Sequence, residues 1–251
     1  MNRRVYMDHS ATTPTRREVV EAMNPYFLET FGNASSVHKF GREARAALDE
    51  ARETVAAQIG ASPEEIIFTS GGTESDNLAL KGTAFARKQK GQHIITSAIE
   101  HHAVLNTCGW LEKNGFKVSR LPVDRQGRVS PDDLREALRD DTILVSIMLA
   151  NNEVGVLQHV AELAAISQEA RAVFHTDAVQ AVGKIPVKVD GLGVDLLSIS
   201  AHKFYGPKGM GVLYRRQGTR IESLQQGGHH ENNLRAGTEH VPGAVGMAEA
   251  L

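Results

Sequence analysis

Short apolar runs recur along this chain and alternate with longer segments of helical periodicity. The runs are 66–69, 93–97, 117–123, 142–150, 172–176, 194–200 and 211–215. Several are apolar at consecutive positions, as expected for strands that are covered on both faces. Strands that alternate with helices are typical of a parallel sheet between helical layers. The pattern therefore predicts an α/β fold with a mainly parallel, seven-stranded sheet between helices.

Capping residues set the expected helix boundaries. Helices are predicted over 40–59 and 74–90, because Gly60 and Gly91 follow them and glycine is favoured just beyond a helix C-terminus. Another helix is expected to begin at Ser130, with proline at its first position. The sequence has no internal repeat or low-complexity tract, which favours one continuous domain over 1–251.

Composition and charge exclude several classes of partner. The chain has 251 residues, of which 41% are hydrophobic, and a formal net charge of -2 without a basic run. Nucleic acid and anionic membranes are therefore not expected as partners. A small ligand is the expected partner instead. The longest apolar run, 143–150, is too short to span a bilayer.

The N-terminus and the cysteine content bear on the compartment. Asp8 and His9 follow the early arginines before an apolar segment can form, so no signal peptide is expected. The single cysteine, Cys108, excludes an intramolecular disulfide and a multi-cysteine metal site. These features predict a cytoplasmic protein.

A glycine-rich turn follows the first predicted strand. Gly71, Gly72 and Thr73 stand between run 66–69 and the helix that follows. The N–H groups and the dipole at a helix N-terminus suit a phosphate. The alternative is a turn that only caps the helix.

Lys203 follows the predicted strand 194–200 and precedes a glycine-rich loop. Ligands of such sheets bind beyond the carboxyl ends of the strands. Desolvation there lowers the pKa of an amine and makes it a usable nucleophile for a Schiff base. The alternative is a solvated loop lysine, which is the more common situation for a single lysine.

Other polar residues follow neighbouring predicted strands. Asp177 is a candidate partner for the pyridine nitrogen of pyridoxal phosphate (PLP), and the alternative is a helix N-cap. Gln180 lies one helical turn beyond Asp177. His101 and His102 could cover a cofactor ring or move a proton, and Asn152 is either a site residue or a left-handed turn residue. Adjacent histidines also occur in metal sites, but the ligand spacing of such sites is missing, so no metal is expected.

These features occur in the order typical of one enzyme family. The chain resembles class V, fold type I PLP-dependent enzymes, and more narrowly the cysteine desulfurases of the NifS/IscS kind. The matching segments cover essentially the whole chain: YMDHSATTP, FGNASSVHKFGREAR, FTSGGTESDNLALKG, EHHAVLNTC, NNEVGVLQ, HTDAVQAVGK, SISAHKFYGPKGMGVLY and NNLRAGTEHVPGAVGMAEAL.

The resemblance implies a role for each matched residue. Lys203 would form the Schiff base with PLP, Asp177 would pair with the pyridinium, and His101 would stack on the ring and shuttle protons. Gln180 would contact the phenolic oxygen, and Asn33 and Asn152 would bind the substrate. Thr238 would contact the phosphate of the neighbouring subunit. The phosphate of the same subunit would be bound by Gly72, Thr73, Ser200 and His202. A homodimer is implied, with L-cysteine as substrate and an iron–sulfur scaffold or another sulfur acceptor as partner.

The chain departs from the family pattern in its C-terminal part. Family members carry a persulfide cysteine and a carboxylate-binding arginine further downstream, and neither is present in 1–251. We therefore expect a PLP-binding large domain with an N-terminal segment, without the C-terminal small domain, and a packing role for Cys108. The alternatives are a naturally short form, another class V enzyme such as an aminotransferase or selenocysteine lyase, and a non-catalytic scaffold with this fold.

Overall fold

The computed structural model describes residues 4–251. Met1 to Arg3 lie outside the described residues, and they belong to the N-terminus in which no signal peptide is expected. The strands are β1 (Ile66–Thr69), β2 (His93–Ser97), β3 (Lys117–Leu121), β4 (Thr142–Ser146), β5 (Val173–Asp177), β6 (Leu196–Ser200) and β7 (Gly211–Arg215). The helices are α1 (Arg17–Met23), α2 (Pro25–Leu28), α3 (Lys39–Ile59), α4 (Gly72–Arg87), α5 (His102–Lys113), α6 (Pro131–Ala137), α7 (Val160–Glu169), α8 (Val189–Leu192) and α9 (Val241–Ala250).

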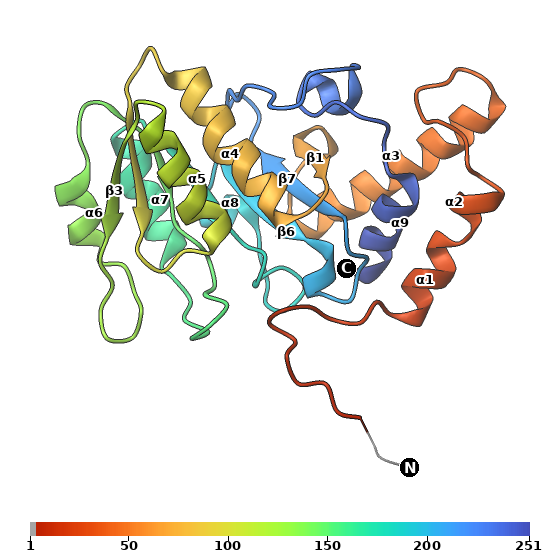
Figure 1. The fold of residues 1–251 in the computed structure, drawn as a ribbon, viewed down its shortest axis with the longest axis horizontal. Helices are drawn as coiled ribbons and strands as arrows, with labels where there is room; N and C mark the ends of the chain where they lie inside the picture. Colours follow the sequence, from red (N-terminus) through yellow and green to blue (C-terminus); the bar gives the residue numbers. More distant parts are fainter. Residues whose placement is uncertain (1–3) are drawn as a thin grey trace.

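All seven strands join one sheet in the order β1-β7-β6-β5-β4-β2-β3 (Figure 1). The strands from β3 to β6 are parallel, whereas β7 is antiparallel to both of its neighbours, β6 and β1. Because β7 is antiparallel to both β1 and β6, these two strands run in the same direction. The prediction of a mainly parallel seven-stranded sheet is confirmed.

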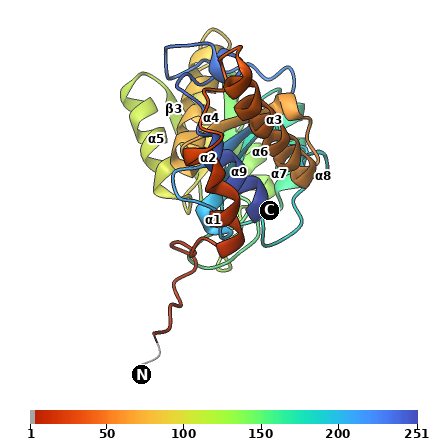
Figure 2. The ribbon, with the colours of Figure 1, turned by 90° about the vertical axis from the view of Figure 1, so that its right-hand side faces the viewer.

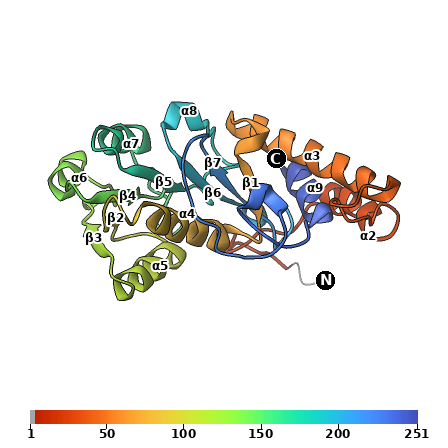
Figure 3. The same cartoon turned by 90° about the horizontal axis from the view of Figure 1, so that it is seen from above.

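Helices cover both faces of the sheet (Figure 3). Helix α4 packs on the central strands and α5 on β3, while α6, α7 and α3 lie on the opposite face. Neighbouring strand residues therefore enter different cores: Ile94 packs under α4 and α5, and Ile95 packs on the other side. This explains why the strands are apolar at consecutive positions.

A second helical group lies at one end of the sheet. Helix α9 packs against both α1 and α3, and the three helices lie together in the side view (Figure 2). Within residues 4–251, no helix has both the length and the apolar character that a membrane span requires.

Helix boundaries agree with the sequence in two of three regions. Helix α3 ends at Gly60, whose φ of 71° is left-handed, and Ser130 caps α6 by accepting from the backbone N–H of Asp132. The predicted cap at Gly91 is wrong, since α4 ends at Arg87. A Cβ atom at Gly91 would lie 2.2 Å from the carbonyl oxygen of Asp141, so this glycine permits a close backbone approach instead.

Candidate active site

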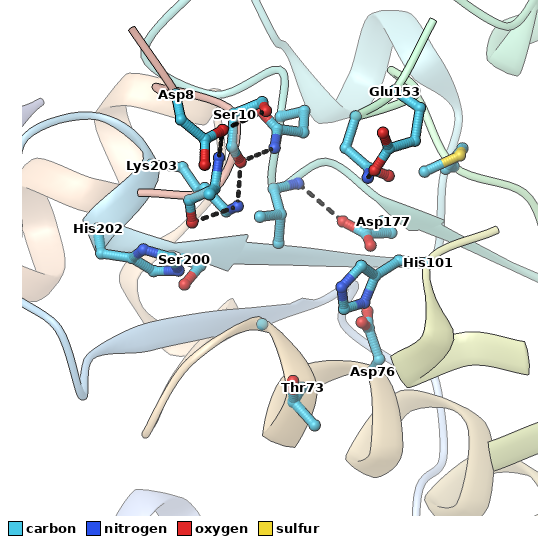
Figure 4. Close-up of a pocket in the computed structure, with 16 residues that line it drawn as sticks. Asp8, Ser10, Thr73, Asp76, His101, Glu153, Asp177, Ser200, His202 and Lys203 are labelled. Carbon is cyan, nitrogen blue, oxygen red and sulfur yellow. Dashed lines mark hydrogen bonds between the residues drawn. The ribbon is translucent and has the colours of Figure 1, made fainter. Parts of the chain in front are cut away.

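A cavity of about 510 Å³ opens at the carboxyl ends of the central strands (Figure 4). Nine of the predicted site residues line it together. They are Gly72, Thr73, His101, Asn152, Asp177, Gln180, Ser200, His202 and Lys203. They meet because β4, β5 and β6 are parallel, which brings the turns after these strands to one edge of the sheet.

Lys203 enters the cavity from a short turn, Ala201–Lys203, directly after β6. Its Nζ donates hydrogen bonds to the carbonyl oxygens of Ser10 and Ala11 in the N-terminal segment. Burial lowers the pKa of this amine, although the acidic groups of Asp177 and Asp8 oppose the shift. The side chain is thus held inside the site and is not a solvated loop lysine, and its amine is closer to the reactive neutral form than that of an exposed lysine.

Asp177 is the last residue of β5 and is buried. Its Oδ1 accepts a hydrogen bond of 2.9 Å from the backbone N–H of Val179, so one oxygen has the local turn role considered as the alternative. Burial raises the pKa of Asp177, while the N–H of Val179 and the nearby His101 and Lys203 favour the ionised form. The second oxygen is available to a cationic partner in the cavity.

The N-terminus of α4 supplies an anion-binding corner. This 16-residue helix begins at Gly72, and a Cβ atom at that position would lie 2.8 Å from Cγ2 of Val179 and 3.5 Å from Cβ of Ser200. Any larger residue would have to displace the side chain of Val179, so glycine fits best where the helix N-terminus meets the cavity wall. The hydroxyl groups of Thr73 and Ser200 border the same space. Free N–H groups, a helix dipole and hydroxyl donors together fit a phosphate group.

His101 is the N-cap of α5. Its Nδ1 accepts a hydrogen bond of 3.1 Å from the backbone N–H of Ala103, which leaves Nε2 for the cavity. A ring nitrogen of His101 and carboxylate oxygens of Asp76 and Asp177 lie within 4.8 Å of one another. This spacing alone does not establish a cation site, and the expectation of no metal stays a prediction.

Gln180 and Asn152 complete the wall near the N-terminal segment. Nε2 of Gln180 donates to the Ser10 carbonyl oxygen at 2.8 Å, and Nδ2 of Asn152 donates to Oε1 of Glu153 at 2.6 Å. The left-handed alternative for Asn152 is wrong, because its φ is not positive.

Two predicted residues lie elsewhere. Asn33 is exposed and accepts from the backbone N–H of Ser35 at 2.8 Å, and Thr238 is exposed beside Glu239. Neither lines the cavity. The expected role of Thr238 involves a second subunit and that of Asn33 involves a bound substrate, so both roles stay predictions.

Sequence reasoning missed seven residues that line the cavity: Asp8, Ser10, Ala11, Asp76, Met148, Glu153 and Val179. Asp8, Ser10 and Ala11 line it because the N-terminal segment is tied to the turn after β6, where Thr13 donates to the carbonyl oxygen of His202 at 2.9 Å. No local pattern signals this contact. Asp76 could have been found, because it shares the buried face of α4 with residues three and four positions later, and an acid on such a face is unusual.

The residues present fit PLP, the cofactor implied by the resemblance. The cavity combines an amine, a buried carboxylate and a helix N-terminus whose first residue, Gly72, packs closely against Val179. These groups match the aldehyde, the ring nitrogen and the phosphate of PLP respectively. The buried thiol is elsewhere: Cys108 is on the buried face of α5, in the core that this helix shares with α4 and the sheet, so its predicted packing role is confirmed.

Comparisons with known proteins identify the family of the chain. The family model described as aminotransferase class-V matches residues 5–251. Proteins named cysteine desulfurase IscS from Dictyoglomus turgidum and Methanosarcina thermophila are 63% and 59% identical to the chain over 251 and 249 residues. These matches cover 100% and 99% of this chain but only 64% and 62% of the two relatives.

Solved structures give the same result. A structure described as a NifS-like protein is 47% identical with a TM-score of 0.97, and the match covers 99% of this chain and 68% of that one. A structure described as SspA in complex with cysteine is 43% identical with a TM-score of 0.95. That match covers 98% of this chain and 71% of the SspA chain. The expected fold type I architecture is confirmed. The chain therefore belongs to the class-V aminotransferase family, in the group of the NifS-like and IscS proteins.

Proposed function

We propose that this chain is the PLP-binding domain, residues 1–251, of a cysteine desulfurase that converts L-cysteine to L-alanine and passes on the sulfur. The observation that carries the proposal is the meeting of Lys203, Asp177, His101 and the α4 N-terminus around one cavity. Members of this family use PLP as cofactor. The names of the relatives support the substrate class, and one related structure is described as a complex with cysteine.

When bound, PLP would supply an aldehyde that links to amines and a ring that accepts the electron pair released from the substrate α-carbon. Lys203 would link to the aldehyde, Asp177 would hold a proton at the ring nitrogen, and Gln180 would face the phenolic oxygen. Gly72, Thr73, Ser200 and His202 would hold the phosphate.

Two side chains are placed to move protons. Lys203 can take the α-proton as a free amine, because burial lowers its pKa. His101 has its Nδ1 engaged by the Ala103 N–H, so a proton exchanged with the cavity moves through Nε2. Asn152 and Asn33 are proposed to face the substrate.

The thiol that receives the sulfur must be one other than Cys108. That side chain is fully buried, and burial raises the pKa of its thiol to about 12. A thiolate is needed to attack the substrate sulfur, and Cys108 provides neither the thiolate nor access to the cavity.

A homodimer in the cytoplasm is the proposed setting. Large apolar side chains are exposed on α2 and the segment that follows it, including Leu28 at 82% and Phe31 at 64%. Such surface supports contact with another polypeptide. In the proposed dimer, Thr238 reaches the partner's phosphate site, and an iron–sulfur scaffold or another sulfur acceptor is the downstream partner.

The test is uptake of PLP by the purified chain. We expect a visible absorbance band that borohydride reduction converts to a stable adduct, and mass mapping should place that adduct on Lys203. Lys203→Ala should abolish the adduct. Lys208→Ala is the matched control, because Lys208 is a lysine of the same glycine-rich loop, and it should leave the adduct intact. An adduct that persists in the Lys203 variant would refute the assignment.

A further inference from the structure

Asp76 is a fully buried acid on α4, one helical turn beyond Gly72. Its carboxyl group lines the cavity next to His101 and close to Asp177 (Figure 4). Its Oδ1 has no hydrogen-bond partner within the described part of the chain. Burial of an ionised carboxylate without partners is unfavourable, whereas a protonated carboxyl group is tolerated there.

Two segments present titratable groups to Asp76. Strand β5 contributes Asp177 and His175, and the turn between β2 and α5 contributes Glu100 and His101. A carboxylate oxygen of Asp76 lies within 4.8 Å of both a ring nitrogen of His101 and a carboxylate oxygen of Asp177. Nε2 of His175 is 3.6 Å from Oδ1 of Asp76, slightly beyond hydrogen-bond distance.

His175 cannot neutralise the acids above it. Its ring is held between the hydroxyl groups of Ser146 and Ser198, at 2.8 Å from Nδ1 and 3.0 Å from Nε2. Burial lowers the pKa of His175 to about 3, so the imidazole is uncharged at neutral pH. Asp76 and Asp177 are therefore a buried acid pair that His175 leaves without a positive charge on the sheet side.

The surroundings favour ionisation of Asp177 over Asp76. Asp177 accepts the N–H of Val179, and Lys203 and His101 lie on its cavity side. Burial and the neighbouring charge of Asp177 raise the pKa of Asp76 well above its usual range, and the Ser198 hydroxyl opposes this rise only in part. Two carboxyl groups this close in a low dielectric do not both ionise.

We propose, building on the PLP-binding function above, that Asp76 is a positioning residue: it keeps the proton of the buried acid pair, so that Asp177 carries the single negative charge that faces the cofactor ring. The protonated group also carries a hydrogen-bond donor, which a carboxylate lacks. The amide of an Asp76→Asn variant preserves both the neutral charge and a donor, whereas alanine preserves only the neutral charge.

The experiment compares wild-type protein, Asp76→Asn and Asp76→Ala. The dissociation constant for PLP is measured by absorbance titration, and the midpoint of the pH dependence of the bound PLP band is measured between pH 6 and 9. We expect Asp76→Asn to match the wild type in both readouts, and Asp76→Ala to bind PLP about tenfold more weakly, as expected for the loss of about 1.4 kcal/mol. A midpoint shift of a full pH unit in the Asn variant would show that Asp76 is charged, and an alanine variant with wild-type affinity would show that Asp76 has no role; either result overturns the proposal.

Controls separate folding from positioning. Thr83→Ala removes another buried group of α4, a hydroxyl that has no hydrogen-bond partner among residues 4–251. Thr83 does not line the cavity, so this variant should leave PLP binding unchanged. Thermal unfolding checks each variant, and Asp76→Ser replaces Asp76→Ala if the latter does not fold.

Unfolding without PLP distinguishes failure of the inference from failure of the proposed function. If wild-type protein takes up no PLP, the proposed function fails. The protonation of Asp76 is still tested, because a raised pKa in the folded state predicts that the wild type loses stability relative to Asp76→Asn as the pH rises. Stability curves that stay parallel would contradict the inference.

Discussion

Glu100 should make the wild-type protein less stable as the pH rises through neutrality, and Glu100→Gln should remove this effect. The side chain joins the turns that follow β2 and β4: its Oε1 accepts from the Ser97 hydroxyl at 2.6 Å and from the Met148 N–H at 2.9 Å. Oε2 is buried and has no partner among residues 4–251. Burial raises the pKa of Glu100 from its ordinary value of 4.5 to about 8.

The direction of this stability change follows from the number of protons bound by the folded and the unfolded chain. Between pH 4.5 and about 8, the folded state keeps a proton on Glu100 that the unfolded chain has released, so the stability contributed below pH 4.5 is lost progressively up to about pH 8. At 1.36 kcal/mol per pH unit, this interval of roughly 3.5 units corresponds to about 5 kcal/mol as an upper limit. Glutamine does not ionise, so the variant lacks this loss.

The assay is urea unfolding of the wild type and the variant at intervals from pH 5 to 8. The difference in unfolding free energy should move in favour of Glu100→Gln as the pH rises, by about 1 kcal/mol per pH unit. A constant offset is also expected, because the extra N–H donors of glutamine are buried, and this offset does not affect the slope. Glu112→Gln is the control, since Glu112 is half-exposed, pairs with Arg120 and has a lowered pKa. Equal slopes for wild type and Glu100→Gln would refute the assignment of a neutral Glu100.

Two further predictions concern Cys108 and Arg52. Cys108 should resist iodoacetamide at pH 8 in the folded protein and react in urea, because burial raises the pKa of its thiol to about 12; rapid alkylation of the native protein, measured by mass spectrometry, would contradict its packing role. Arg52→Ala should lower the unfolding free energy by about 3 kcal/mol or more, because Arg52 donates to both carboxylate oxygens of the buried Glu231, at 2.9 and 2.7 Å. The exposed ion pair of Arg17 with Glu21 gives the control, and an Arg52 variant as stable as Arg17→Ala would show that the buried pair contributes little.

Much of the site could be predicted because it lies at strand ends. Consecutive apolar residues identify covered strands, and the geometry of parallel strands then brings the residues after them to one edge. Strand-end position alone predicts His101, Asp177 and Lys203, and the cavity contains all three. The strand order was not predictable in the same way, because β7 stands between β1 and β6 through long-range pairing that no local pattern encodes.

The remaining misses have related physical causes. The sequence predicts a helix cap at Gly91, but its lack of a side chain serves a close backbone contact with Asp141, which is 50 residues further along the chain. The contribution of Ser10 depends on its contact with Lys203, which is 193 residues away along the chain. Local propensity is informative about helices and strands, whereas such contacts depend on the completed tertiary structure.

The docking of the N-terminal segment also has a consequence for folding during synthesis. Thr13 and its partner His202 are 189 residues apart along the chain. At a translation rate of roughly 5–20 residues per second, the segment waits about 10–40 s before its partner has been made. The cavity wall formed by this segment therefore cannot be completed early in translation, and until then its polar backbone groups stay accessible to water and chaperones.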